Sequence, residues 1–521
     1  MESEQTTGRR FRVVIAGAGV AGLEAMLVLR GLAGAQVEIE LLAPAEEFEF
    51  RPLLVSEPFG LELPVRLGLA PIVAEAGAHH TREALSSVDP AAHIVSTDRG
   101  SEIAYDALLV APGAKPIDAV PGALSFSGEG ERARFRDLLA ALGRRGSKRL
   151  AIAVPAQATW SIAAYELALL TAAERDARSL KDVELTLVTH EAAPLELLGA
   201  PASQLVAAKL EEAAVGLRTA SAPTRFEDGR LHLREGDPIE VDHAVALPGL
   251  EAPTLPGLPQ NSGGFVATDV RMHVEGLEDV WAAGDVTSFP IKQGGLAAQQ
   301  ADVAARSIAA KAGVHAPLQS FQPVLRAALI TGGGLEYLRS QGPAGEAAGA
   351  RALWWPPTKV AGTHLGPLLA RAAGEGADEV LVDLEPSREP EADEAERKRA
   401  TELVLAAADA DAKAGDLAGA LRWLGLVEHL NLVLPPDYAG KRYEWRRELD
   451  PDLAPDAVAA RIDPAFVSAQ AGLSDLQRRV GWLREIEGDS EREMEDHLAE
   501  LDAGMEHLRR LSRQSGALRS R

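Results

Sequence analysis

The sequence contains no cysteine, which excludes disulfide frameworks, thiolate metal sites and any redox-active disulfide. It also lacks an excess of basic residues, because 77 aspartates and glutamates against 53 lysines and arginines give a formal charge of −24. That charge argues against a nucleic-acid-binding surface, which needs a basic stripe. No apolar run approaches the roughly 20 residues that a membrane-spanning helix requires. The first residues lead directly into a strand pattern without a signal-peptide apolar region, so we expect a cytoplasmic protein.

One glycine-rich turn organises the rest of the chain. Residues 11–25 read FRVVIAGAGVAGLEA, a β-branched run followed by a tight turn and an Ala/Leu-rich helical segment. This strand–turn–helix context is the one that a dinucleotide-binding fingerprint requires. The residues of the turn are Gly17, Gly19, Val20, Ala21 and Gly22. We expect the turn and the helix N-terminus to receive a pyrophosphate.

Two later stretches have the same character. The run YDALLVAPGA ends a buried strand pattern in Ala111, Pro112 and Gly113, a turn that lets the backbone come near a ligand. The run VWAAGDV ends a second strand pattern in Gly284 and Asp285 and is followed by a predicted helix over 296–310. An aspartate at such a strand end can bond sugar-like hydroxyl groups.

In this order, GAGVAG, YDALLVAPGA and VWAAGDV resemble the three FAD motifs of two-domain flavoproteins of the pyridine nucleotide-disulfide reductase type, over residues 11 to about 310. The resemblance implies an α/β fold with two Rossmann-like three-layer domains, the second inserted in the first, and FAD as cofactor. It implies that Gly17, Gly19 and Gly22 hold the FAD pyrophosphate and that Asp285 bonds the ribityl chain. The helix beginning near Gly295 and Leu296 would point at the flavin.

Four charged residues are further candidates, each with an alternative interpretation. Lys292 is a cation beside the flavin pyrimidine edge or a solvated loop lysine. Glu46, its neighbour Glu47 or the backbone alone would hold the adenosine ribose. Arg51 lies in the FEFRPLL loop, which either folds over a ligand or packs on the surface. Glu166 is an acid/base group near the flavin or a helix-surface glutamate.

The expected domain organisation has six parts, since 521 residues are too many for one core. They are an FAD-binding domain (11–124 and 242–318), an NAD(P)-binding-like domain (125–241), an interface segment (319–374), an acidic linker (375–399), a tetratricopeptide-like helical hairpin (400–447) and a helical hairpin or short coiled coil (463–515). In the interface segment, Trp354 and Trp355 either anchor at a membrane interface or fill a core or subunit contact.

The expected NAD(P) site is degenerate. The strand pattern over 148–154 is followed by a turn that places Pro155, Gln157 and Trp160 where the family has three glycines. Proline lacks an N–H group, and the other two side chains occupy space that backbone and phosphate need. Binding of NADH in the usual pose is therefore not expected.

In outline the chain resembles the branch that holds sulfide:quinone oxidoreductases and type II NADH dehydrogenases. The sulfide branch works through cysteines, so sulfide oxidation by that route is excluded by composition. We predict an FAD-dependent oxidoreductase with a small-molecule donor and acceptor, a quinone being the acceptor the resemblance suggests. A homo-oligomer is expected, either free in the cytoplasm or in peripheral contact with the cytoplasmic membrane face. The alternatives are a type II NADH dehydrogenase-like enzyme with an atypical nicotinamide site, and a non-catalytic flavin-binding scaffold whose helical C-terminus binds a partner.

Overall fold

The computed structural model describes residues 10–61, 66–144 and 148–340, then 348–349, 353–355, 358–372, 382–383 and scattered positions from 405 to 448. The chain divides into two compact units, Met1–Ala439 and Gly440–Arg521, and both parallel sheets lie in the first. The expected helical segment 463–515 lies outside the described residues, as does the linker 375–399 apart from 382–383. Only scattered positions of the hairpin 400–447 are described. Within the described ranges, no helix combines the length and apolarity needed to cross a bilayer.

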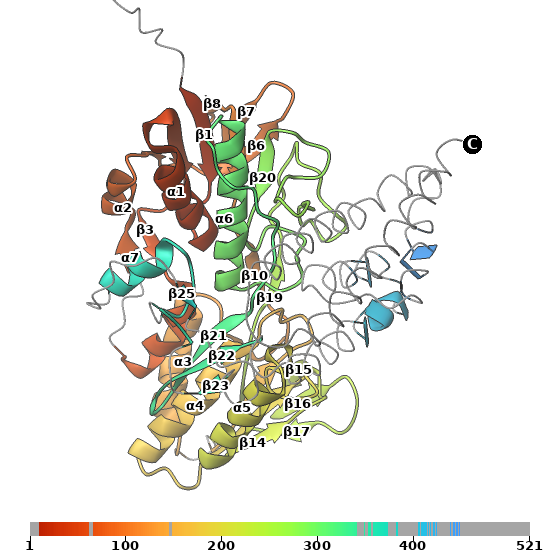
Figure 1. Cartoon of the computed structure of the whole chain (residues 1–521). Coiled ribbons are helices and arrows are strands. Elements are labelled where there is room, and N and C mark those ends of the chain that lie inside the picture. Colours follow the sequence, from red (N-terminus) through yellow and green to blue (C-terminus); the bar gives the residue numbers. More distant parts are fainter. Residues whose placement is uncertain are drawn as a thin grey trace, which may run out of the picture. The chain divides into compact units, whose positions relative to one another are not determined.

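A five-stranded parallel sheet, in the order β20-β9-β1-β2-β5, forms the first nucleotide fold. Figure 1 labels two of its strands, β1 and β20. Its strands are β1 (Phe11–Ala16), β2 (Val37–Leu42), β5 (His79–Thr81), β9 (Ala107–Val110) and β20 (Val280–Ala282). Ile15 of β1 lies opposite Leu41 of β2 and Leu109 of β9. The central strand β9 is a continuous buried run because both faces of the sheet are covered.

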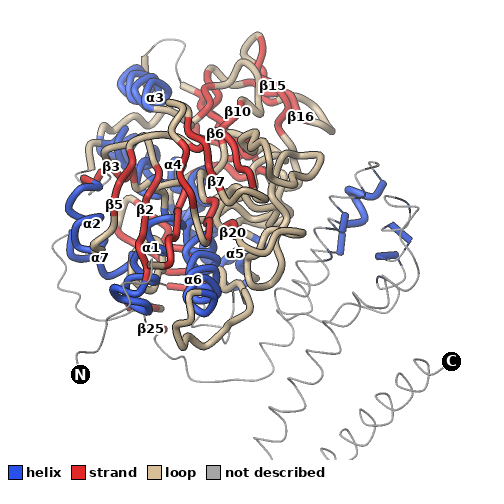
Figure 2. Tube along the Cα trace, turned by 90° about the horizontal axis from the view of Figure 1, so that it is seen from above, coloured by secondary structure: helices blue, strands red, loops and turns tan. Residues whose placement is uncertain are grey.

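Helices cover one face of this sheet and a small antiparallel sheet covers the other. The helices α1 (Val20–Ala33) and α6 (Gly294–Lys311) lie against each other, as Figure 2 shows. The side chains of Val14 and Ala16 pack in one cluster with residues of β6 (Leu85–Asp89), β7 (Ile94–Thr97) and β8 (Glu102–Ala104). The result is the three-layer arrangement that the sequence predicts.

A second parallel sheet, in the order β11-β18-β12-β13-β14, repeats this plan. Its strands are β11 (Leu124–Ser125), β12 (Arg149–Val154), β13 (Glu184–Thr189), β14 (Val215–Arg218) and β18 (His243–Ala246). Its helices are α3 (Glu129–Ala141), α4 (Ile162–Ala177) and α5 (Ala200–Glu212), and its antiparallel strands are β15 (Pro223–Glu227), β16 (Arg230–Leu233) and β17 (Ile239–Glu240). Because β18 pairs with β12, the second fold runs beyond the expected boundary at residue 241.

The second fold interrupts the first, since β20 and α6 come after it in the chain. This confirms the predicted α/β class with two Rossmann-like folds. After α6, the hairpin of β21 (Arg326–Thr331) and β22 (Gly334–Arg339) lies beside α4 (Figure 1). The remaining elements are η1 (Gly34–Gln36), β3 (Glu47–Glu49), η2 (Arg51–Phe59), β4 (Arg66–Gly68), α2 (Leu69–Glu75), β10 (Lys115–Ile117), η3 (Glu196–Leu198), β19 (Gly249–Glu251), β23 (Ala348–Gly349), β24 (Trp354–Trp355), α7 (Leu365–Ala372) and β25 (Val382–Asp383).

Candidate active site

The turn after β1 is built so closely that it requires glycine. Gly17 has φ +122°, and a Cβ atom there would lie 2.1 Å from the carbonyl oxygen of Ala111. A Cβ atom on Gly22 would lie 1.8 Å from the carbonyl oxygen of Gly17. Around Gly19, in contrast, no atom of the described residues lies within 4 Å of an added Cβ. The turn therefore leaves room for a ligand only at its middle glycine.

The N-terminus of α1 is free to bind an anion. Its N-cap is Gly19, no side chain in the described part of the chain caps it, and its first turn contains no acidic residue. The first helical hydrogen bond runs from the Leu23 amide to the Gly19 carbonyl at 3.0 Å, so the amides of Val20, Ala21 and Gly22 have no intrahelical acceptor. These amides and the helix dipole fit a pyrophosphate such as that of FAD.

The two other predicted turns meet this one at the carboxyl edge of the sheet. The Ala111 amide donates to the Ala16 carbonyl at 2.8 Å, which places Ala111 and Pro112 directly against Gly17. Gly113 comes next, with φ +79°. On the other side, Gly284 has φ +81°, and its added Cβ would lie 3.2 Å from the Cβ of Ala21. The structure thus brings the three sequence-predicted turns together.

Asp285 faces two positive charges. Its half-buried carboxylate has no hydrogen-bond partner within the part of the chain that the structure describes. Burial raises the pKa of Asp285, and the charges of Lys292 and Arg51 oppose that rise. Arg51 is exposed at the start of η2. Because its charge acts on Asp285, the FEFRPLL loop lies near this edge of the sheet. An unpartnered acceptor here fits a hydroxyl of the ribityl chain.

Lys292 is fixed by its surroundings. Its ammonium group donates a hydrogen bond to the Thr287 carbonyl and lies 4.1 Å from the centre of the Phe265 ring. A lysine over an aromatic face in this way is attracted by the ring. These contacts hold Lys292 near Asp285. A lysine in a solvated loop, the alternative interpretation, would not make them.

Two predicted ligands are engaged by other groups of the protein. Glu46 is exposed, and its carboxylate forms an ion pair with Arg82. At the start of α6, the Leu296 amide donates to the Gln293 side chain at 2.7 Å, and Gln293 in turn donates to the Arg326 carbonyl at 2.8 Å. This leaves Gly295 as the predicted α6 ligand whose amide has no acceptor among the described residues. Sequence inspection missed Gln293 because glutamine is not a usual N-cap residue.

Glu166 belongs to a buried ion pair that the sequence did not reveal. Both of its carboxylate oxygens accept hydrogen bonds from the Lys359 ammonium, at 2.5 and 2.6 Å, and one also accepts from the Ile330 amide at 2.8 Å. The Glu166 side chain is 1% exposed and the Lys359 side chain 7%. Burial raises the pKa of Glu166 and lowers the pKa of Lys359, while each charge opposes the shift of the other. Glu166 is therefore not the helix-surface glutamate of the alternative interpretation.

This pair lies close to the N-terminus of α6. Val360, the residue after Lys359, packs so tightly that a Cβ on Gly294 would lie 2.8 Å from its methyl group, and Pro52 of η2 lies on the same side at 3.8 Å. Lys359 lies in the apolar, aromatic stretch 353–369, and a lysine in such a stretch indicates a buried acid elsewhere in the chain, because buried charges are paired.

Trp354 in the same stretch is fully buried, with its ring 5.2 Å from that of Tyr337, as the core alternative predicts.

In the second nucleotide fold, side chains of the protein itself occupy the region at the start of α4. The turn after β12 begins with Pro155, and the N-cap of α4, Ser161, bonds the Glu191 carboxylate at 2.8 Å. Glu191 also accepts from Tyr165 at 2.7 Å and from Thr189 at 2.8 Å, and it is 6% exposed. The carboxylate of Glu191 therefore lies beside the first turn of α4, and a helix N-terminus of this kind is where a phosphate would otherwise bind. Burial raises the pKa of Glu191, and the three hydroxyl donors oppose the rise.

Comparison with known proteins agrees with this description. A family profile described as pyridine nucleotide-disulphide oxidoreductase matches residues 11–307. A sulfide-quinone reductase of Aquifex aeolicus (strain VF5) is 30% identical over 112 residues, which cover 21% of this chain and 26% of that protein, so the match spans about a quarter of that relative's length.

A solved structure shows the same fold. The sulfide:quinone oxidoreductase from the hyperthermophilic bacterium Aquifex aeolicus is 20% identical with a TM-score of 0.58, over 63% of this chain and 83% of that chain. A more distant match is NDH2 from Plasmodium falciparum in complex with NADH, which is 16% identical with a TM-score of 0.45, over 54% of this chain and 65% of that chain.

Proposed function

The chain belongs to the pyridine nucleotide-disulphide oxidoreductase family, a family of FAD-dependent oxidoreductases, and we propose that it passes electrons from a reduced small-molecule donor to a quinone. The observation that carries the proposal is the convergence of the Gly17, Ala111 and Gly284 turns on the N-terminus of α1, beside an Asp285 carboxylate that accepts no hydrogen bond from the described residues. The name of the Aquifex relative supports a quinone as acceptor.

The residues of these turns would hold FAD. The amides at the start of α1 and the open space at Gly19 would receive the pyrophosphate, and Asp285 would accept a ribityl hydroxyl. Arg51 and Lys292 would supply positive charge that stabilises the reduced, anionic cofactor. The amide of Gly295 adds the positive end of the α6 dipole to the same region.

When bound, FAD would supply the two-electron chemistry that links the donor to the quinone, and reduction of a quinone to a quinol also consumes two protons. We assign one of these protons to the pair of Glu166 and Lys359 and the other to solvent. Burial raises the pKa of Glu166 and lowers the pKa of Lys359, and the Lys359 Nζ atom lies 2.5 and 2.6 Å from the two carboxylate oxygens, so the pair is placed to hold and release a proton. No step uses a thiol, since the chain has none.

The donor class is narrowed by the second nucleotide fold. Pro155 and the Glu191 carboxylate disfavour NADH or NADPH as donor, so we do not favour the type II NADH dehydrogenase alternative. The scaffold alternative would leave the buried ion pair beside α6 without a role. We therefore favour a donor small enough to reach the flavin directly.

The test separates the acceptor half-reaction from the unidentified donor. Purified protein is analysed for FAD content, reduced by light under anaerobic conditions, and mixed with ubiquinone-1 in a stopped-flow spectrometer. We expect one FAD per chain and rapid return of the oxidised flavin spectrum. Protein that stays colourless after incubation with FAD, or reduced protein that ubiquinone-1 does not reoxidise, would contradict the proposal.

A further inference from the structure

Glu24 is a buried carboxylate that the proposed reaction does not use directly. It lies on α1, two residues after Gly22, and it is completely buried. Its two oxygens accept hydrogen bonds from the amides of His364 at 3.0 Å and Leu365 at 2.7 Å, at the start of α7. These partners are more than 300 residues away in sequence. Burial of a carboxylate is costly unless hydrogen bonds compensate for the lost water, so these two bonds hold the group in place.

Residues 358–365, which we call the strap, connect this carboxylate to the ion pair. At one end of the strap, Lys359 bonds Glu166 of the second fold. At the other end, Glu24 of the first fold bonds His364 and Leu365. Figure 1 shows α7, which continues from the strap, beside α1.

The middle of the strap crosses the start of α6. Val360 is 1% exposed and packs on Gly294, and a Cβ on Gly362 would lie 2.7 Å from a Glu24 oxygen and 3.4 Å from the Cβ of Ala298. The Gly362 amide also donates to the Val360 carbonyl at 3.0 Å, which folds the strap into a tight turn. A shift of the Glu24 end would therefore be transmitted through close contacts to Lys359.

We propose that Glu24 is a positioning residue, which fixes the strap so that Lys359 reaches Glu166 beside the N-terminus of α6. The proposal rests on the proposed function, because it concerns the delivery of protons in the same site. Two amide hydrogen bonds to one carboxylate define the position of α7 along α1. A hydrophobic residue in place of Glu24 would fill the space but would leave two helix amides without an acceptor.

The raised pKa of Glu24, about 7, is consistent with this arrangement. Burial raises it, the amides of Leu365 and His364 lower it, and Asp302 of α6 raises it further. Asp302 is itself bonded to Arg306 at 2.8 and 3.1 Å.

The experiment is a double-mutant cycle on the full FAD-loaded chain. Glu24→Gln, Lys359→Met and the double variant are photoreduced and mixed with ubiquinone-1, and the reoxidation rate is measured. We expect Glu24→Gln to bind FAD in full and to slow reoxidation by roughly 10- to 100-fold, since small displacements of a reacting group have effects of this size. In the Lys359→Met background, Glu24→Gln should change the rate by less than about twofold, because both act through one group.

Glu75→Gln is the matched control. Glu75 is the exposed residue that pairs with Arg371 of α7 at 3.4 Å, so it contacts the same helix without touching the strap. We expect its reoxidation rate to equal that of the wild type. If Glu24→Gln does not fold, Gly362→Ala displaces the same contact without changing α1, and the same coupling with Lys359→Met is expected.

Additive effects of Glu24→Gln and Lys359→Met would overturn the positioning role, and so would a Glu24→Gln rate equal to that of the wild type. Failure of the proposed function is distinguishable. If the wild type ignores ubiquinone-1 but is reoxidised by the dye dichlorophenolindophenol, the quinone assignment is wrong. The coupling between Glu24 and Lys359 is then measured with the dye, where additivity would again refute it.

Discussion

Replacing Lys359 with methionine tests the buried ion pair most directly. Methionine keeps most of the apolar stem and removes the ammonium group, so Glu166 would retain only the Ile330 amide as a donor. Because both side chains are at least nine-tenths buried, the remaining carboxylate is uncompensated, which costs about 3–5 kcal/mol. A large domain loses about 2 °C of melting temperature per kcal/mol, so we expect a decrease of roughly 5–10 °C.

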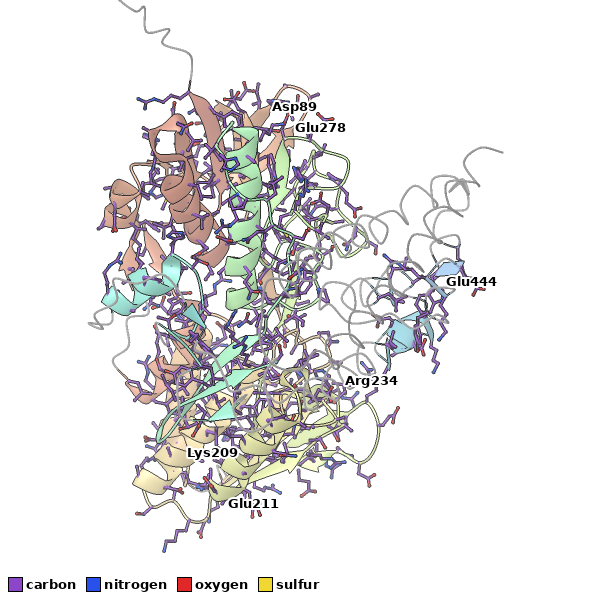
Figure 3. All side chains as sticks on the ribbon, in the orientation of Figure 1. Asp89, Lys209, Glu211, Arg234, Glu278 and Glu444 are labelled. Atoms are coloured by element: carbon purple, nitrogen blue, oxygen red, sulfur yellow. The ribbon has the colours of Figure 1, made fainter. Side chains whose placement is uncertain are left out.

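The assay is scanning calorimetry of the FAD-loaded protein at neutral pH, with Lys209→Met as the control. Lys209, labelled on α5 in Figure 3, pairs with Glu336 at 3.1 Å and is 34% exposed. The ion pair of Lys209 with Glu336, like that of Lys359 with Glu166, joins a helix of the second fold to a segment that follows α6 in the chain. An exposed pair of this kind contributes no more than about 1 kcal/mol, so its loss should lower the melting temperature by about 2 °C.

Equal losses in Lys359→Met and Lys209→Met would refute the reasoning, because burial would then make no difference. The double variant Glu166→Leu with Lys359→Met provides a second check. Removing both charges together should recover most of the lost stability, since a buried pair can be replaced by apolar residues at little cost. If the double variant is as unstable as Lys359→Met, the loss comes from packing and not from charge.

Three other perturbations have expected outcomes. Gly19→Ala should leave the fold intact but weaken FAD binding, because its Cβ enters the open space that the pyrophosphate would fill, whereas Gly17→Ala should also lower the melting temperature because its Cβ would meet the Ala111 carbonyl; the FAD-to-protein ratio and thermal unfolding distinguish the two variants. Millimolar NADH should leave the oxidised flavin spectrum unchanged under anaerobic conditions, and bleaching would show that Glu191 does not block the second fold. The pKa of Glu24 is raised to about 7 by burial, so the folded state holds its proton more tightly than the unfolded state. The free energy of unfolding should therefore fall by about 3 kcal/mol as pH rises from about 4.5 to 7, and urea titrations should show a flatter profile for Glu24→Gln.

The sequence was sufficient where the structure depends on neighbouring residues. The Gly17 turn, the Ala111 turn and the Gly284 turn each come directly after a buried strand, and the residues that shape them are adjacent in the chain. Parallel strands bring such turns to one edge of the sheet, so their convergence results from the strand order. The degenerate turn at Pro155 could also be predicted, because the residues that shape it are adjacent in the chain.

Features that join distant segments could not be predicted in this way. Glu166 and Lys359 are 193 residues apart, and Glu24 and Leu365 are 341 apart. The residues around Glu166 and Glu24 in the sequence do not specify their partners, because both contacts depend on how the strap crosses the two nucleotide folds. The hydrogen bonds of Glu191 could not be predicted either, since a carboxylate after a strand can accept from a ribose hydroxyl or from hydroxyl groups of neighbouring side chains.

The order in which the chain is made has a consequence for the first sheet. β9 lies between β1 and β20, and β20 is synthesised only after the whole inserted fold has left the ribosome. Until then, β9 (Ala107–Val110) presents an unpaired edge of wholly apolar residues, and α1 lacks the helix that shields it. Nascent chains that stop before residue 280 therefore carry a strand ready to pair with another copy, and we expect them to aggregate instead of forming an autonomous flavin-binding fragment.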